Sequence, residues 1–299
     1  MKQILALIAL LTLAVPAHAA GIGEAIAALE AKDYARALET AQPLAEAGEV
    51  DAMTFLGLLY RKGQGVEVNL DRAIDWLGKA AEKNHAPAQL ALALIYLDGS
   101  LGAVDYDRGA SLLRRAAEAG AAEAQFNMGL LAAGSFGNPP DWLAASGWFR
   151  KAADQGHPAA QYHLGVLYLE GMGLTRDAVA AGQWFGKAAQ AGNADAMMDY
   201  GVLVMRGDGV KKDEKIGAQW LLLAARRGNV IAQNRVARLL AFGAGLAADP
   251  VEAQKWNLLA ARAGRPDAEL DSLLAKLTAA EQAEARARAE AFTPEVHGD

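Results

Sequence analysis

Apolar positions in this chain recur with a period of 36 residues, and the register holds through six consecutive units. In one unit, Ala52, Leu56 and Tyr60 lie four residues apart, which predicts a short first helix with one apolar face. Ala73 and Trp76 begin the stripe of a second helix, which an alanine pair continues. The column of Trp76 reads Trp76, Leu112, Trp148, Trp184, Trp220 and Trp256. A repeat of two short helices at this period predicts a solenoid.

Polar residues and glycines mark where these helices begin and end. Asn69 stands just before a second helix, where its side-chain oxygen can accept a hydrogen bond from a free N–H group. The same column in other units holds Asp33, Asp105, Asp141, Asp177, Asp213 and Asp249. Gly63 and Gly65 follow the first helix, where a positive φ lets the chain reverse. The column that ends the second helix holds Gly48, Asn84, Gly120, Gly156, Gly192, Gly228 and Gly264.

Small and large apolar columns predict how the helices pack. The small column, which should let the two helices of a unit approach closely, holds Gly57, Ala93, Gly129, Gly165, Gly201 and Ala237. The tryptophans are expected to fill the wedge between successive units. On this hypothesis, truncating an inner tryptophan to alanine costs about 3–5 kcal/mol. A helix pair this short cannot bury its own apolar face. Each pair therefore needs its neighbours in the stack.

The first residues have the form of a secretory signal peptide. Lys2 precedes an apolar stretch over residues 4–15, and small residues follow it, which predicts cleavage after Ala19 or Ala20. The stretch is shorter than the roughly 20 residues that span a bilayer as a helix. We therefore expect export without stable membrane insertion after cleavage, a retained N-terminal anchor being the alternative.

The other end of the chain is expected to close the stack. A stripe at i, i+3, i+4 and i+7 consists of Leu270, Leu273, Leu274 and Leu277. Thr278 and Glu281 fit a capping box that begins a further charged helix. The predicted parts are a signal peptide at 1–20, a degenerate half repeat or cap at 21–50, six repeats at 51–267, capping helices at 268–292 and a disordered tail at 293–299.

Composition removes several classes of function. The chain has no cysteine, which excludes a lipoprotein attachment, a disulfide framework, a thiolate metal site and a cysteine nucleophile. Its formal charge is −6 and no run of Lys or Arg stands out, which argues against nucleic acid as a partner. Export without disulfides suits the bacterial periplasm, and secretion is the alternative.

Candidate chemistry is sparse. His85 and His157 follow second helices, where an imidazole is expected to meet free carbonyls, and His163 is expected to be a satisfied structural histidine. The Gly-x-Gly triplets follow helices and lack the Lys-Ser/Thr pair of a phosphate loop, so they are interpreted as turns. The acidic loop around Asp98 and Asp105 does not follow the Ca²⁺-loop spacing. We predict no catalytic residue, metal or cofactor.

First-helix positions that packing does not obviously use form a candidate partner-binding groove. They are Thr54, Leu58, Arg61, Leu90, Leu94, Phe126, Leu130, Tyr162, Val166, Met198, Val202, Asn234 and Arg238. The column of Arg61 continues through Leu97, Ala133, Leu169, Met205 and Ala241. We expect a groove that takes a helix or an extended segment of another protein. The open alternative is that packing between units consumes these side chains.

The repeat resembles a known family. Residues 160–173, with the sequence AQYHLGVLYLEGMG, and residues 184–192, with WFGKAAQAG, are similar to a Sel-one-like repeat, a longer relative of the tetratricopeptide repeat. The resemblance implies an all-α fold, an α/α right-handed superhelical solenoid, and a role as an adaptor, often exported in bacteria. Two loops depart from the glycine pattern, residues 99–102 and 135–140, and we expect a bend or bulge there.

The leading hypothesis is an exported, non-enzymatic scaffold that binds a protein or peptide partner. One alternative is a cell-wall-active or β-lactam-binding envelope enzyme, which the absence of cysteine and of a Ser-x-x-Lys motif argues against. A further alternative is a structural subunit of a larger envelope complex.

Overall fold

The computed structural model describes residues 20–295, so the predicted signal segment, apart from Ala20, lies outside the described residues, as do the last four residues of the chain. Over this range the chain forms α-helices and connecting turns and no strand. The predicted all-α solenoid of helix hairpins is confirmed. The chain divides into two compact units, Met1–Pro139 and Pro140–Asp299, and the division falls in the loop that departs from the glycine pattern.

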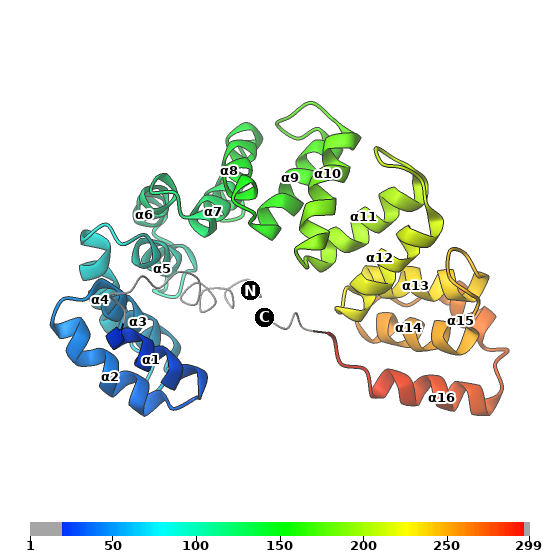
Figure 1. Ribbon diagram of the computed structural model, residues 1–299, viewed down its shortest axis with the longest axis horizontal. Helices are drawn as coiled ribbons and strands as arrows, with labels where there is room; N and C mark the ends of the chain where they lie inside the picture. The colour runs from blue at the N-terminus through cyan, green and yellow to red at the C-terminus, as the bar shows by residue number, and fades with distance from the viewer. Residues whose placement is uncertain (1–19, 296–299) are drawn as a thin grey trace. The chain divides into compact units, whose positions relative to one another are not determined.

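In the first unit, each helix packs against the helices before and after it in the chain (Figure 1). Its helices are α1 (Ala20–Glu30), α2 (Tyr34–Glu46), α3 (Val50–Lys62), α4 (Leu70–Glu82), α5 (Ala86–Leu97), α6 (Tyr106–Glu118) and α7 (Ala122–Ala132). The segment predicted to hold half a repeat is α2, the second helix of a pair. It packs against α1, whose Ile22, Ala25 and Ala28 are buried.

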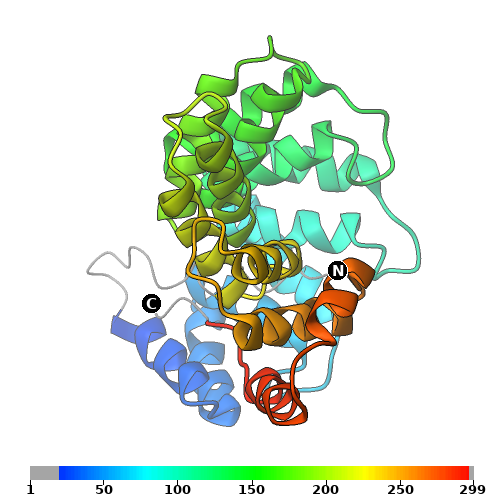
Figure 2. The ribbon, with the colours of Figure 1, turned by 90° about the vertical axis from the view of Figure 1, so that its right-hand side faces the viewer.

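In the second unit each helix packs against the one before it in the chain, except the last, α16, which packs mainly against α14 (Figure 2). Its helices are α8 (Trp142–Asp154), α9 (Pro158–Glu170), α10 (Ala178–Gln190), α11 (Ala194–Arg206), α12 (Glu214–Arg226), α13 (Val230–Phe242), α14 (Pro250–Arg262), α15 (Ala268–Leu274) and α16 (Ala279–Glu290). After α16, the N–H of Glu295 donates to the carbonyl of Arg226 at 2.9 Å. The described end of the predicted tail is therefore held at the end of α12.

The predicted helix ends are confirmed. All seven capping residues accept a hydrogen bond through the side chain from the backbone N–H three residues on, as Asp177 does from Ala180 at 3.0 Å. Every residue of the column that ends the second helix has a positive φ, from 60° at Asn84 to 95° at Gly48. These ends depend on interactions within a few residues, which is why a single sequence predicts them.

The second glycine of each Gly-x-Gly turn has a further role between units. A Cβ at Gly65 would lie 2.7 Å from the carbonyl oxygen of Tyr34, at the start of the preceding second helix. A Cβ at Gly209 would collide with the carbonyl oxygen of Ala178 in the same way. Each turn therefore packs directly on the backbone of the preceding repeat.

The small column confirms the close approach of the two helices within a unit. A Cβ at Gly57 would lie 2.5 Å from Cγ of Leu77, and one at Gly165 would lie 2.7 Å from the ring of Phe185. The large side chain of the second helix thus fits directly against the glycine of the first.

The prediction that the tryptophans fill the wedge between units is wrong for four of the five. Trp76, Trp148, Trp184 and Trp220 are only half-buried, with Trp256 the exception at 1% exposed. The core column lies one residue later and is 0–2% exposed: Leu77, Leu113, Phe149, Phe185 and Leu221. One residue along a helix turns the side chain by about a quarter turn, since 3.6 residues make one full turn. That rotation places the tryptophan at the edge of the buried stripe.

Lysines lie over the exposed rings of the tryptophan column. Lys79 lies 4.5 Å from the ring centroid of Trp76, and Lys187 lies 4.0 Å from that of Trp184, each three residues further along its helix. Trp256 differs because Phe292, which follows α16, lies against it at 5.3 Å between ring centroids. Trp256 also has a lysine over its ring, Lys255 at 4.2 Å, so the covering segment is what distinguishes it from the half-buried tryptophans.

Four buried glutamines connect successive repeats, a role that was not predicted from the sequence. Each donates through Nε2 to a carbonyl eight residues earlier, in the last turn of the preceding second helix, at 3.1–3.3 Å. They are Gln89, Gln125, Gln161 and Gln233. Each of these carbonyls also accepts a backbone N–H at its helix end, as that of Ala81 does from Asn84 at 3.0 Å, so the glutamine of the next repeat adds a second hydrogen bond.

These contacts predict different costs for two adjacent residues of α10. Replacing the buried Phe185 with alanine should lower the free energy of unfolding by about 3–5 kcal/mol, because it leaves a cavity beside Gly165. Replacing Trp184 with alanine should cost only about 1–2 kcal/mol, since this side chain is partly exposed. Urea unfolding followed by circular dichroism measures both, and an equal or larger loss for Trp184→Ala would contradict the assignment of the core.

Candidate functional site

The thirteen residues predicted to form a groove all lie on the first helices of the repeats, but their accessibility differs. Six are buried: Thr54, Leu58, Leu90, Phe126, Leu130 and Met198. Seven are partly exposed: Arg61, Leu94, Tyr162, Val166, Val202, Asn234 and Arg238. Five of these seven belong to the second unit, on α9, α11 and α13. The accessible part of the predicted groove is therefore concentrated there.

In the first unit, polar contacts join consecutive first helices. Arg61 on α3 forms an ion pair with Asp98, the residue after α5, at 2.8 Å, and its side chain is only 10% exposed. Thr54 lies 2.9 Å from Nδ1 of His85, whose Nε2 lies 3.0 Å from Asp51. Burial lowers the pKa of His85, and the carboxylate of Asp51 opposes this shift. These side chains serve the packing of the stack.

The histidine positions differ from the expectation that the imidazoles meet free carbonyls. His85 and His157 precede first helices, and Nδ1 of His157 accepts a hydrogen bond from the N–H of Ala160 at 3.1 Å. His163 stacks on Phe149, with ring centroids 5.0 Å apart, and burial lowers its pKa. All three histidines therefore have contacts within the stack. His85 and His157 lie at the start of a first helix, whereas the sequence predicted contacts with the carbonyls at the end of a second helix.

In the second unit, a partly buried carboxylate lies beside the accessible face. The hydroxyl of Tyr162 donates to Oδ2 of Asp199 on the next first helix at 3.2 Å. Burial raises the pKa of Asp199, while the hydrogen bond from Tyr162 lowers it; Asp195 adds to the rise and Arg235 opposes it. Burial also raises the pKa of the Tyr162 hydroxyl, as does the charge of Asp199. This pair connects α9 to α11.

Arg238 on α13 is committed to the C-terminal end of the stack. It forms two hydrogen bonds with Asp267, at 2.8 and 2.9 Å, and one with Glu269 at 2.9 Å. Asn234 donates to Asp267 at 3.0 Å. Burial raises the pKa of Asp267, but the hydrogen bonds from Asn234 and Arg238 outweigh it and leave the pKa below its ordinary value. Two of the predicted groove residues therefore hold α15 in place.

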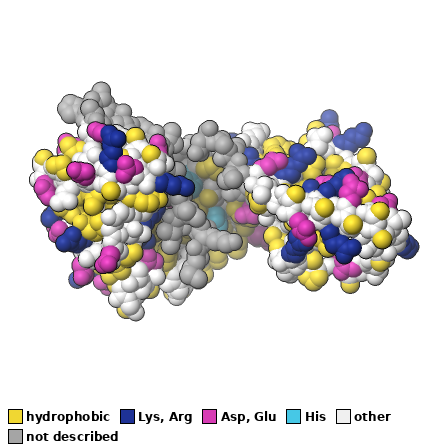
Figure 3. Space-filling view, turned by 90° about the horizontal axis from the view of Figure 1, so that it is seen from below, with side chains coloured by type: hydrophobic (Ala, Val, Ile, Leu, Met, Phe, Trp, Pro, Cys, Tyr) yellow, Lys and Arg dark blue, Asp and Glu magenta, His cyan; other side chains and the backbone are white. Residues whose placement is uncertain are grey.

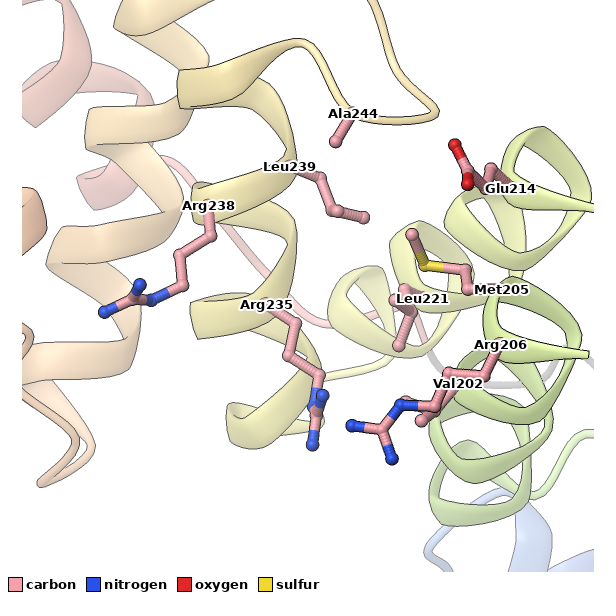
Figure 4. A pocket seen from close by; sticks show the side chains of 9 residues that line it. All are labelled: Val202, Met205, Arg206, Glu214, Leu221, Arg235, Arg238, Leu239 and Ala244. Atoms are coloured by element: carbon pink, nitrogen blue, oxygen red, sulfur yellow. The ribbon is translucent and has the colours of Figure 1, made fainter. Parts of the chain in front are cut away.

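A pocket of about 410 Å³ opens between α11, α12 and α13 (Figure 4). The predicted residues that it brings together are Val202 and Arg238, along with Met205 of the Arg61 column. Its lining is Val202, Met205, Arg206, Glu214, Leu221, Arg235, Arg238, Leu239 and Ala244. The pocket thus combines an apolar wall with three arginines and one carboxylate.

The sequence analysis did not identify Arg206, Arg235 or Leu239 as site residues. Arg206 ends its helix, and the other two lie in columns outside the predicted set. The one sequence signal was the spacing of Arg235 and Arg238, since residues three apart on a helix are neighbours on its surface. This spacing gave no information on Arg206, which belongs to the preceding repeat.

The described part of the chain offers no other recognisable chemistry. Between residues 20 and 295, no three His, Asp or Glu side chains are grouped to hold a metal ion. No helix in that range is both long and apolar enough to cross a membrane. Lys and Arg side chains are interspersed with Asp and Glu on the face drawn in Figure 3, so no region of one charge dominates it.

Comparison with known proteins identifies the family. The Sel1 repeat model matches residues 50–85, 86–120, 122–157, 158–193, 194–229 and 230–264. A Sel1 repeat protein from Oxalobacter formigenes is 27% identical, with a TM-score of 0.70 over 80% of this chain and 96% of that one. No curated protein matches.

A second solved structure has the same fold. It is a protective antigen present in uropathogenic Escherichia coli strains and displays an SLR fold. It is 27% identical, with a TM-score of 0.53 over 91% of this chain and 68% of that one. With six matched repeats that cover most of its length, this chain belongs to the Sel1 repeat family.

Proposed function

We propose that this protein is a non-enzymatic adaptor that binds a segment of another protein on the first-helix face of its second unit. We define the first-helix face as the accessible side chains of α9, α11 and α13: Tyr162, Val166, Val202, Met205, Arg206, Arg235 and Leu239. The observation that carries the proposal is the pocket between α11, α12 and α13, which is the part of this face that stacking leaves unfilled.

The composition of the pocket favours binding over catalysis. Its described lining holds no His, Ser or Cys, and its one carboxylate, Glu214, is paired with Lys212 at 2.9 Å. Val202, Met205 and Leu239 offer apolar area, and methionine adapts its shape to a partner. Helical repeats present such surfaces as extended sites for segments of other proteins.

A pair of matched variants tests this function. Val202→Asp places a charge in the first-helix face, and Val179→Asp makes the same change on α10, where Val179 is 54% exposed. In affinity capture from a periplasmic extract read by mass spectrometry, the unaltered protein and Val179→Asp should retain the same partner. Val202→Asp should lose it, because a buried unpaired charge opposes docking.

The comparison requires folded variants, which thermal unfolding of each purified protein establishes. Equal retention of the same proteins by Val202→Asp and by the unaltered chain would refute the proposed binding face.

We also propose export to the periplasm, with secretion as the alternative. The support is the N-terminal sequence, in which a basic residue, an apolar stretch and small residues follow in order.

Export predicts a shortened chain. The intact mass of protein isolated from its own cells should correspond to a chain that begins at Ala20 or Gly21, recovered in the periplasmic fraction. Leu11→Arg interrupts the apolar stretch and should leave the precursor uncleaved inside the cell. A full-length cytoplasmic product from the unaltered gene would contradict export.

A further inference from the structure

Two arginines of the pocket form no ion pair with any described residue. Arg206 extends from the end of α11 and Arg235 from α13, and their side chains run toward one another at the pocket, while Arg238 points away from it (Figure 4). Within residues 20–295, neither Arg206 nor Arg235 forms an ion pair or a side-chain hydrogen bond. Nε of Arg235 is buried and has no hydrogen-bond partner.

The acidic groups nearby are already engaged or lie on the far side. Asp199 accepts the hydroxyl of Tyr162, and Arg235 affects it only by lowering its pKa through charge. Glu214, the one carboxylate in the lining, pairs with Lys212 at 2.9 Å. The chain as a whole has a formal charge of −6, so two converging guanidinium groups that form no ion pair differ from their surroundings.

The remaining lining of the pocket is apolar. Val202 and Met205 come from α11, and Leu239 comes from α13, while the buried Leu221 lies behind them. A ligand that satisfies this lining therefore carries an anionic group and an apolar group close together. Guanidinium groups suit carboxylates because their planar fork matches the two oxygens.

We infer that the pocket binds an acidic peptide segment of a partner protein, in which an Asp or Glu lies next to a large apolar side chain. The carboxylate pairs with Arg206 and Arg235, and the apolar side chain enters between Val202, Met205 and Leu239. This inference rests on the proposed function and adds the chemistry of the bound segment. Two cations beside an apolar wall do not make the phosphate-tracking stripe that nucleic acid needs.

A random octapeptide library displayed on phage tests the inference on the full mature chain. The unaltered protein should enrich peptides with Asp or Glu beside Leu, Met or Phe. The double variant Arg206→Gln/Arg235→Gln should lose the acidic preference. The control Lys211→Gln/Lys215→Gln removes the same charge from exposed lysines of the same unit and should keep it.

Fluorescence polarisation with the most enriched peptide gives the size of the effect. The arginine variant should bind about tenfold more weakly or worse, because the peptide carboxylate then loses both charged partners. The lysine variant should stay within about twofold, because exposed charges away from the site contribute little. Added salt should weaken binding to the unaltered protein more than to the arginine variant.

The possible failures are distinguishable. Enrichment of apolar peptides without an acidic residue, or equal affinity of the arginine variant, overturns the charge pairing and leaves the binding face intact. Failure of the unaltered protein to enrich any peptide overturns both this inference and the proposed function.

Discussion

The structure depends on the contact between a small residue of each first helix and a large residue of the following second helix. Gly57 against Leu77 and Gly165 against Phe185 show how closely the two helices approach. Each hairpin still has an apolar face to bury, and the next hairpin covers it. The buried glutamines and the inter-unit glycine turns add polar and backbone contacts to the same interface. Each hairpin is therefore stabilised by the hairpins next to it, as expected for a linear array of repeats.

The last neighbour of the array is replaced by a cap. Trp256 occupies the column that is half-exposed elsewhere, yet it is buried because Phe292 covers it. Arg238 and Asn234 reach across to Asp267, which also begins α15 by accepting a hydrogen bond from Leu270. The cap at the end of the stack thus engages Arg238 and Asn234, whereas Arg235 on the same helix lines the pocket.

The sequence predicted the caps and turns of this fold. It did not show which side chain of a helix faces the core, or which residues of different repeats are in contact. Caps and positive-φ positions depend on residues a few places apart, so Asp177 and Gly192 could be assigned correctly. The 36-residue period aligned Trp184 and Phe185 equally well, and it did not show which of them faces the core. Glutamine recurs in the column of Gln161 in four of the six repeats, but the carbonyl that it binds lies at the end of the preceding helix, which the period alone does not show.

The candidate site shows the same limit. The column analysis selected Val202 and Arg238, which do line the pocket, but also Thr54 and Leu90, which are buried. Arg206 and Arg235 come from different units and different columns, so only the packed structure brings them together. A periodic sequence specifies its shared scaffold well, while a site made by one pair of units breaks the period and has no repeated signal.

Hydrogen exchange on the variant Leu221→Ala tests the central claim, that each hairpin is held by its neighbours. The variant removes a core side chain of α12, and protection of backbone amides should fall most in α11, α12 and α13. Protection in α2 to α5, in the other compact unit, should be unchanged. A uniform loss of protection from α2 to α16 would contradict the account, because it would show one core shared by the whole chain.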